Sequence, residues 1–265
     1  MSESSASSYL QGLFGLDGQT AVVIGGTGVL GGAICDALGG AGAHTVVVGR
    51  DAERGETRAE AVRAAGGSAE FQAADSTRRE ELEAIIASQV AAGRRIDVLV
   101  NGAGINSATP FLDIGEDEWE RIVAVNLTGV RLACQVFGAA MLADDRGGSI
   151  INIASLSGMT ALSRVFTYSV TKAGVLNLTQ NLAREWATSG VRVNAISPGF
   201  FPAEQNRKVL TPERIESIMT HTPMDRFGEP QELAGAILLL ASAAAGSFLT
   251  GQNVVVDGGF TATTI

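Results

Sequence analysis

The chain has 265 residues, a length that suits one large α/β domain or two small ones. Its formal net charge of −9 argues against a nucleic-acid surface or an anionic membrane as the partner, and it is compatible with a soluble enzyme whose basic groups lie in a local pocket. Cys35 and Cys134 lie far apart without a metal-ligand pattern, so we expect no disulfide framework, no metal site and a reducing compartment.

Two stretches bear on the location of the protein. Residues 1–14 lack the basic region and the long apolar core of a signal peptide. The apolar run 233–251 contains glycine and serine and precedes the last predicted strand, which favours a buried helix over a membrane span. We therefore expect a cytoplasmic protein.

Short apolar, β-branched runs alternate with helical patterns along the whole chain. The strands are expected at residues 20–25, 44–49, 69–74, 96–101, 148–154, 191–197 and 253–258. The helices are expected at residues 31–41, 52–65, 77–92, 117–142, 166–189 and 230–244. This alternation is typical of a doubly wound, Rossmann-type α/β fold with helices on both faces of a mostly seven-stranded parallel sheet. No linker or repeat divides the chain, so we expect residues 1–265 to form a single domain.

Residues 200–229 interrupt this alternation with a loop and short helices that carry proline, phenylalanine and charged residues. An insertion after the carboxyl end of a strand is where an α/β sheet places a substrate lid. We expect such a lid here. The alternative is a surface helical excursion that only adds packing.

The first predicted strand is followed directly by GGTGVLGG, in which Gly25, Gly28 and Gly31 have a G-x-x-G-x-x-G spacing. Such glycines let the backbone approach a pyrophosphate at the N-terminus of the following helix, and Thr27 can add a hydroxyl donor. Glycine is abundant in this chain, so the position between a strand and a helix is what makes the motif credible as a dinucleotide site.

The end of the second strand predicts which dinucleotide is bound. An acid at this point usually hydrogen-bonds the ribose hydroxyls of NAD, whereas an arginine can pair with the 2′-phosphate of NADP. Gly49 occupies the expected acid position and Arg50 follows it, while Asp51 comes late and can instead cap the next helix. We therefore predict NADP(H) in preference to NAD(H), which stays open as the alternative.

Two further strand ends belong to this predicted site. Asp75, after the third strand, can accept a hydrogen bond from the adenine amino group or cap the following helix. The stretch NGAG, residues 101–104, ends the fourth strand beside the point where the strand order reverses. Its glycines would let the backbone pass close to the adenosine ribose.

The fifth strand leads to Ser155, and the stretch YSVTK follows with Tyr168 and Lys172. The chain has only two tyrosines and two lysines, yet one of each lies four residues apart, on one face of a predicted helix. In these residues the chain resembles a short-chain dehydrogenase/reductase, from about Leu16 to Thr261. The motifs that carry the resemblance are the glycine-rich turn, NGAG, VNLTG (125–129), Ser155, YSVTK, VRVNAISPG (191–199) and LTGQNVVVDGG (249–259).

The resemblance implies a catalytic tetrad of Asn126, Ser155, Tyr168 and Lys172. Tyr168 would exchange a proton with the substrate oxygen, and a nearby ammonium and an oxidised nicotinamide ring would lower its pKa from the ordinary value near ~10. Lys172 suits this place better than an arginine because its compact ammonium can join a proton relay. Ser155 would hydrogen-bond the substrate oxygen, and Asn126 would hold a water that connects Lys172 to solvent.

The resemblance also implies the contacts with the cofactor. The expected cofactor-binding residues are Gly25, Thr27, Gly28, Val29, Leu30, Gly31, Arg50, Asp75, Ser76, Asn101, Gly102, Ala103, Gly104, Tyr168, Lys172, Pro198 and Gly199. The turn departs from the common T-G-x-x-x-G-x-G form of the family, since Ile24 replaces the threonine and Val29 the middle glycine. This departure bears on the detailed phosphate contacts rather than on the binding role.

The segment GFFPAEQNRKVL (199–210) resembles sugar-acid and polyol members of the family, including the D-mannonate oxidoreductase type. The expected substrate-binding residues are Ser157, Arg164, Phe200, Gln205 and Asn206, with Phe201 as a wall of the pocket and Arg207 as a further polar contact. We expect an oxidoreductase that transfers a hydride between NADP(H) and a secondary alcohol or ketone, such as a polyol or sugar acid.

Two other functions stay open at this stage. A 3-oxoacyl thioester reductase has similar motifs, although the chain shows no obvious basic patch for an acidic carrier protein. A non-catalytic redox sensor that binds NADP is a candidate of another class, but it would not need Ser155, Tyr168 and Lys172 together. The resemblance also suggests a homotetramer in which the helices at 117–142 and 166–189 and the carboxyl-terminal segment meet other subunits.

Overall fold

The computed structural model describes residues 5–201 and 211–263. Seven parallel strands form one sheet in the order β3-β2-β1-β4-β5-β6-β7. The strands are β1 (Thr20–Ile24), β2 (His44–Gly49), β3 (Ser68–Ala73), β4 (Val98–Asn101), β5 (Gly148–Ile153), β6 (Val191–Pro198) and β7 (Asn253–Val256). The helices are α1 (Ser5–Phe14), α2 (Val29–Gly40), α3 (Ala52–Ala64), α4 (Arg79–Ala91), α5 (Glu116–Val123), α6 (Gly129–Leu142), α7 (Phe166–Trp186), α9 (Pro212–His221) and α10 (Ala234–Ala241).

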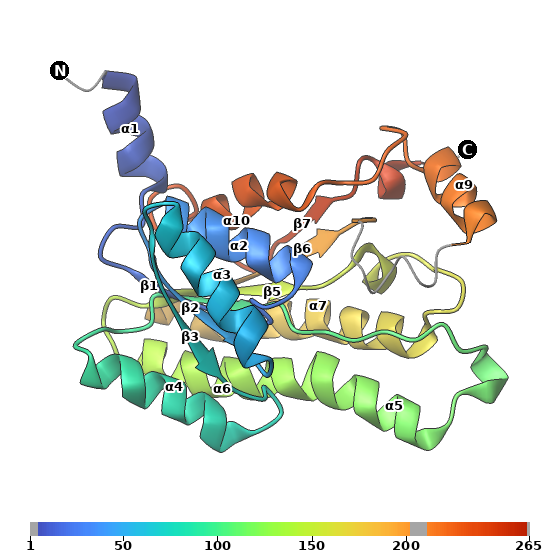
Figure 1. Cartoon of the computed structure of the whole chain (residues 1–265), viewed down its shortest axis with the longest axis horizontal. Helices are drawn as coiled ribbons and strands as arrows, with labels where there is room; N and C mark the ends of the chain where they lie inside the picture. The colour runs from blue at the N-terminus through green and yellow to red at the C-terminus, as the bar shows by residue number, and fades with distance from the viewer. Residues whose placement is uncertain (1–4, 202–210, 264–265) are drawn as a thin grey trace.

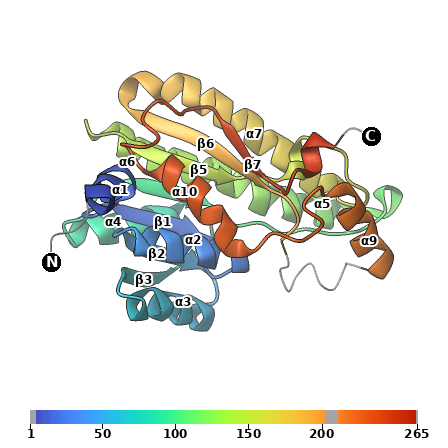
Figure 2. The same ribbon diagram turned by 90° about the horizontal axis from the view of Figure 1, so that it is seen from above.

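Helices cover both faces of the sheet, with α2, α3 and α10 on one side and α4, α6 and α7 on the other (Figures 1 and 2). The side chains of β1 show why. Ala21 and Val23 belong to the apolar core under α2 and α10, whereas Val22 and Ile24 belong to the core under α4, α6 and α7. Because successive side chains of a strand point to opposite faces, a continuously apolar strand requires a helix layer on each side. The predicted seven-stranded, doubly wound sheet is confirmed.

Three elements differ from the prediction. The helix expected at 117–142 is a continuous run in which a π-helical segment, Ala124–Thr128, joins α5 to α6. The helix expected at 230–244 starts with a 3-10 turn, Pro230–Leu233, and its α-helical part ends at Ala241. Helix α1 was not predicted, and it projects from the body of the molecule at the opposite end from α9 (Figure 1).

Within the described part of the chain, one helical run is long and apolar enough to cross a membrane by length and composition. It is Glu116–Leu142, with a mean hydropathy of 1.5, and half of its most apolar window is buried inside the protein. The α6 part packs against α4, α7 and β5. Such burial is typical of a core helix that covers a sheet.

Part of the predicted lid is visible. Helix α9 is amphipathic, buries Ile218, and begins after Thr211, whose hydroxyl accepts a hydrogen bond from Arg214 N. The Arg214 side chain reaches the segment before α7 and donates to the carbonyl oxygen of Ser163 at 3.0 Å. Residues 202–210 lie outside the described part, so the lid function stays a prediction.

Candidate active site

Most predicted site residues follow the carboxyl ends of strands β1 to β6, which lie at one edge of the sheet because all strands are parallel. Asn126 lies in the π-helical segment, and Tyr168 and Lys172 lie on α7. The strand order reverses between β1 and β4. In an open α/β sheet this switch point is where a crevice forms for a ligand.

The glycine-rich turn after β1 is built for close backbone approach. Gly25 has φ +82°, and a Cβ there would lie 2.6 Å from the amide nitrogen of Ala103 in the loop after β4. A Cβ on Gly31 would collide with the carbonyl oxygen of Gly25. Helix α2 follows Gly28 without a side-chain cap and without an acid in its first turn. Its first backbone amides are therefore left to bind an anion, as the pyrophosphate of a dinucleotide requires.

At the end of β2, the side chain of Thr27 fills the space beside Gly49. A Cβ on Gly49 would lie 2.6 Å from Cγ2 and 2.8 Å from Oγ1 of Thr27. Asp51 caps α3, accepting a hydrogen bond from Arg54 N at 3.0 Å. Arg50, between them, is exposed. This strand end thus offers the Arg50 cation to a 2′-phosphate, while the nearest carboxylate, Asp51, is engaged as the cap of α3.

Asp75 and Asn101 both have partners within the protein. Asp75 Oδ1 accepts from the amide and the hydroxyl of Thr77, at 2.9 and 2.7 Å, and so closes the turn before α4 without capping the helix itself. Burial opposes ionisation, but these bonds and the charges of Arg50 and Arg78 hold the pKa of Asp75 below its ordinary value. Asn101 is buried and donates to Asn152 Oδ1 at 2.8 Å, which ties β4 to β5.

Ser76, Pro198 and Gly199, which are also predicted to bind the cofactor, lie at or after the carboxyl ends of β3 and β6, at the same edge of the sheet. Ser76 is buried, and a Cβ on Gly129 would lie 3.0 Å from its hydroxyl oxygen. Pro198 ends β6, and Gly199 N donates to Val256 O at 2.9 Å. A Cβ on Gly199 would lie 2.6 Å from Asp257 Cα, so the glycine allows this close approach.

Lys172 and Tyr168 meet at the base of the site, as their spacing on α7 predicts. Lys172 is 3% exposed, and its ammonium donates to the carbonyl oxygen of Ile153 at 2.6 Å and lies 5.5 Å from the centre of the Tyr168 ring. Burial lowers the pKa of Lys172 to about 8. Burial raises the pKa of Tyr168, and a hydrogen bond with Ser155 opposes that rise. The structure thus brings the three predicted catalytic side chains together, and their joint role in proton transfer stays a prediction.

Ser155 is positioned by the end of β5 and by a short turn. Its extended backbone leads into the 3-10 turn Leu156–Gly158. A Cβ on Gly158 would lie 2.8 Å from the carbonyl carbon of Lys172, so this turn packs directly against the backbone of α7. The glycine therefore lets Ser155 reach the helix that carries the other catalytic side chains.

Asn126 lies in the π-helical segment and is fully buried. Its side chain forms two reciprocal hydrogen bonds with the backbone of Ile105, each 2.8 Å, and donates to Thr171 Oγ1 at 3.3 Å. A Cβ on Gly104 would lie 3.6 Å from both Asn126 Oδ1 and Lys172 Nζ. The amide thus fixes the loop after β4 against α7, while its predicted role of holding a water stays a prediction.

The predicted substrate residues are only partly together. Ser157 is buried and hydrogen-bonded to Ser155 at 3.1 Å, whereas Arg164 is exposed with φ +64°. Phe200 packs edge-on against Phe260 with ring centres 5.3 Å apart, and Phe201 is buried. Gln205, Asn206 and Arg207 lie outside the described residues, as does most of the segment that resembles sugar-acid enzymes.

Three functional groups were missed in the sequence analysis: the carbonyl of Ile153, the backbone of Ile105 and the hydroxyl of Thr171, which accepts from Asn126. Two of them are backbone groups, which every residue has, so no sequence signal marks them. Thr171 does stand next to Lys172, and its place within YSVTK was a usable signal.

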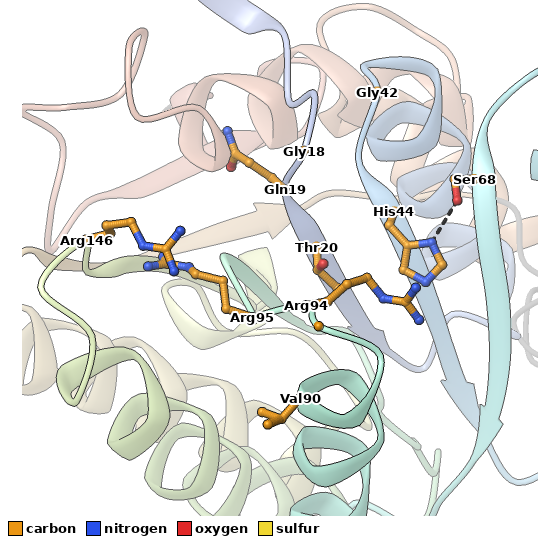
Figure 3. A pocket seen from close by; sticks show the side chains of 11 residues that line it. Gly18, Gln19, Thr20, Gly42, His44, Ser68, Val90, Arg94, Arg95 and Arg146 are labelled. Atoms are coloured by element: carbon orange, nitrogen blue, oxygen red, sulfur yellow. Dashed lines mark hydrogen bonds between the residues drawn. The ribbon is translucent and has the colours of Figure 1, made fainter.

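A cavity of about 620 Å³ lies at the opposite edge of the sheet, lined by residues at the start of β1, β2 and β3 (Figure 3). Its arginines are neutralised by neighbouring acids: Arg94 lies 3.2 Å from Glu70, Arg95 2.7 Å from Asp97 and Arg146 2.8 Å from Asp144. This cavity is separate from the catalytic residues. Among the residues that the structure describes, no group of His, Cys, Asp and Glu side chains is arranged to hold a metal ion.

Comparison with known proteins agrees with this geometry. A family model described as "Enoyl-(Acyl carrier protein) reductase" matches residues 27–261. Galactitol 2-dehydrogenase from Rhizobium johnstonii is 41% identical, covering 94% of this chain and 97% of the relative. A 3-oxoacyl-[acyl-carrier-protein] reductase from Synechocystis is 36% identical over 92% of this chain and 97% of the relative. The crystal structure of a gluconate 5-dehydrogenase from Burkholderia cenocepacia, in complex with NADP and tartrate, superimposes with a TM-score of 0.91 at 34% identity, covering 96% of this chain and all of the other.

The dinucleotide turn, the Ser155–Tyr168–Lys172 unit and these matches define a dehydrogenase built on a doubly wound sheet. The chain belongs to the short-chain dehydrogenase/reductase family and is an oxidoreductase.

Proposed function

We propose that this protein interconverts a secondary alcohol and a ketone on a polyol or a sugar acid, with NADP(H) as the cofactor. The observation that carries the proposal is the contact between Ser155, Tyr168 and the buried Lys172, at the same sheet edge as the uncapped start of α2. When bound, the nicotinamide supplies or accepts the hydride. Binding, orientation of the substrate and proton transfer are carried out by residues of this protein.

The cofactor would be held by residues of the first two strand ends. The amides at the start of α2 face the pyrophosphate, and Gly25 and Gly31 leave room for it. Arg50 pairs with the 2′-phosphate, and the packing of Thr27 against Gly49 keeps an acid from that place. The NADP named for the gluconate 5-dehydrogenase structure supports this choice.

Proton transfer follows from the local electrostatics. Tyr168 gives its phenolic proton to the oxygen of a ketone during reduction and takes it back during oxidation. Lys172, held on Ile153 O, lies close enough to stabilise the phenolate, and Ser155 donates a hydrogen bond to the substrate oxygen. The buried position of Lys172 strengthens its effect because little water screens the charge.

The substrate class rests on the relatives. Galactitol and D-threitol dehydrogenases and gluconate 5-dehydrogenases act on polyols or sugar acids by name. The Synechocystis relative keeps 3-oxoacyl thioester reduction as a second candidate. Turnover with NADPH and NADH should be measured on polyols, sugar acids and acetoacetyl thioesters in both directions. Turnover of a polyol or sugar acid supports the proposal; turnover of thioesters alone supports the second candidate, and NADPH binding without turnover on any class supports a sensor.

We further propose a cytoplasmic homotetramer that forms through the helices at 117–142 and 166–189 and through the carboxyl-terminal segment, with the 3-10 turn Phe111–Asp113 beside the start of α7. Phe111 and Phe166 pack edge-on with ring centres 5.3 Å apart and are both exposed, and Leu112 and Val170 are exposed nearby in the sequence. An exposed apolar patch of this kind marks a protein interface. Light scattering should give the mass of four chains, and a mass of one chain would contradict the proposal.

A further inference from the structure

Ser157 is buried behind Ser155 and has one hydrogen-bond partner for its hydroxyl. Its side chain is 5% exposed, and its hydroxyl donates to Ser155 Oγ at 3.1 Å. Its backbone amide donates to the same oxygen at 3.2 Å. Among the described residues, no other partner of the Ser157 hydroxyl is present. A buried hydroxyl aimed at a catalytic oxygen is therefore a feature that substrate binding does not explain.

These two bonds decide which way Ser155 can donate. A serine hydroxyl has two lone pairs and one proton. When the lone pairs accept from Ser157 N and Ser157 Oγ, the proton of Ser155 is left to point away from the turn. Tyr168 is the partner on that side, since burial raises its pKa and a hydrogen bond with Ser155 opposes the rise. Accepting two hydrogen bonds also polarises the Ser155 hydroxyl and makes it a stronger donor.

We propose that Ser157 is a positioning residue that orients the single proton of the Ser155 hydroxyl, which is donated to Tyr168 in the free protein and to the substrate oxygen when a substrate is bound. The inference deepens the proposed function and rests on it for its catalytic meaning. The turn that carries both serines is held by α7, because Gly158 packs on the backbone of Lys172. Tyr168 and Lys172 are the titratable side chains at this end of the helix, so the orientation acts on the side chains to which we assign proton transfer.

The first test needs no substrate. Tyr9 and Tyr168 are the only tyrosines, and Tyr9 is 68% exposed on α1, so a Tyr9→Phe protein reports Tyr168 alone by the ultraviolet absorbance of tyrosinate. We expect Ser157→Ala to raise the apparent pKa of Tyr168 in this background, and to have no effect once Ser155→Ala is also present. An unchanged titration, or the same change with and without Ser155, overturns the proposal whether or not the protein turns over a substrate.

Kinetics give the second test. Removing a hydrogen bond of this kind should lower kcat by about five- to tenfold with a smaller change in KM, and should move the basic limb of the pH profile upward. Ser157→Thr, which keeps the hydroxyl, should restore the rate.

Ser169→Ala is the matched control, since it deletes a hydroxyl beside Tyr168 that has no partner. A uniform loss at every pH, or wild-type rates in Ser157→Ala, would contradict the proposal, while an inactive wild type would contradict the proposed function instead. Unaltered NADPH binding and circular dichroism show that a variant has folded.

Discussion

The ammonium of Lys172 donates to the carbonyl oxygen of Ile153 at 2.6 Å. The bond joins α7 to the end of β5, and it fixes the cation 5.5 Å from the centre of the Tyr168 ring. Without this bond, the flexible side chain of Lys172 would have to lose conformational entropy each time its ammonium approached the phenol of Tyr168. The backbone of a central strand thus positions the ammonium to which we assign a role in proton transfer.

This buried lysine should make stability depend on pH. Its pKa is about 8 in the folded protein and 10.5 for the free side chain, so between these values the unfolded chain binds more protons. The free energy of unfolding of the wild type, relative to Lys172→Met, should therefore rise as the pH increases from 8 to 10.5, by about 3 kcal/mol in total. Urea unfolding of both proteins across this range measures the difference. A constant difference would show that Lys172 has the same pKa in the folded and unfolded proteins, so that its ammonium is solvated rather than buried.

Tyr168→Phe removes the proton donor and keeps the ring over Lys172. We expect kcat to fall by about 10²- to 10⁴-fold, the range for loss of general acid–base catalysis. NADPH binding, followed by fluorescence, should change little because the aromatic volume is retained. Substantial residual turnover would mean that another group exchanges the proton.

Arg50→Ala should change the KM for NADPH and not the KM for NADH. Loss of a charge-assisted hydrogen bond to the 2′-phosphate should raise the KM for NADPH by about ten- to a hundredfold and leave that for NADH unchanged. Arg146→Ala, which removes an equal charge at the opposite edge of the sheet, is the control for net charge. If both cofactors respond equally, Arg50 does not contact the 2′-phosphate.

Asn126→Leu should destabilise the fold as well as the site. The change leaves the amide and carbonyl of Ile105 without their partners, each at a cost of about 1–3 kcal/mol. Unfolding in urea should show a loss of about 2–4 kcal/mol. Asn181→Leu on the exposed side of α7 should change stability by less than about 0.5 kcal/mol. A small effect at Asn126 would mean that water replaces the amide.

The fold was predictable because its signals are local. The continuously apolar runs, the glycines that end them and the helical stretches between them predicted all seven strands to within two residues. The π-helical segment at Asn126 was not predicted because it has the composition of an ordinary helix, and its contacts are with the remote residues Ile105 and Thr171. Helix α1 was missed because its short, serine-rich sequence carries little helical signal.

The sequence by itself determined that Tyr168 and Lys172 share a helix face, that glycines follow β1, and that no acid stands at Gly49. Only the tertiary structure decided that Ile153 O holds the ammonium, that Thr27 fills the space beside Gly49, and that Ser157 donates to Ser155. The physical reason is that spacing along one element fixes which side chains are neighbours on it. Three other features arise only when remote segments pack together: a hydrogen bond to a backbone carbonyl, the filling of the space beside a glycine, and the orientation of a hydroxyl.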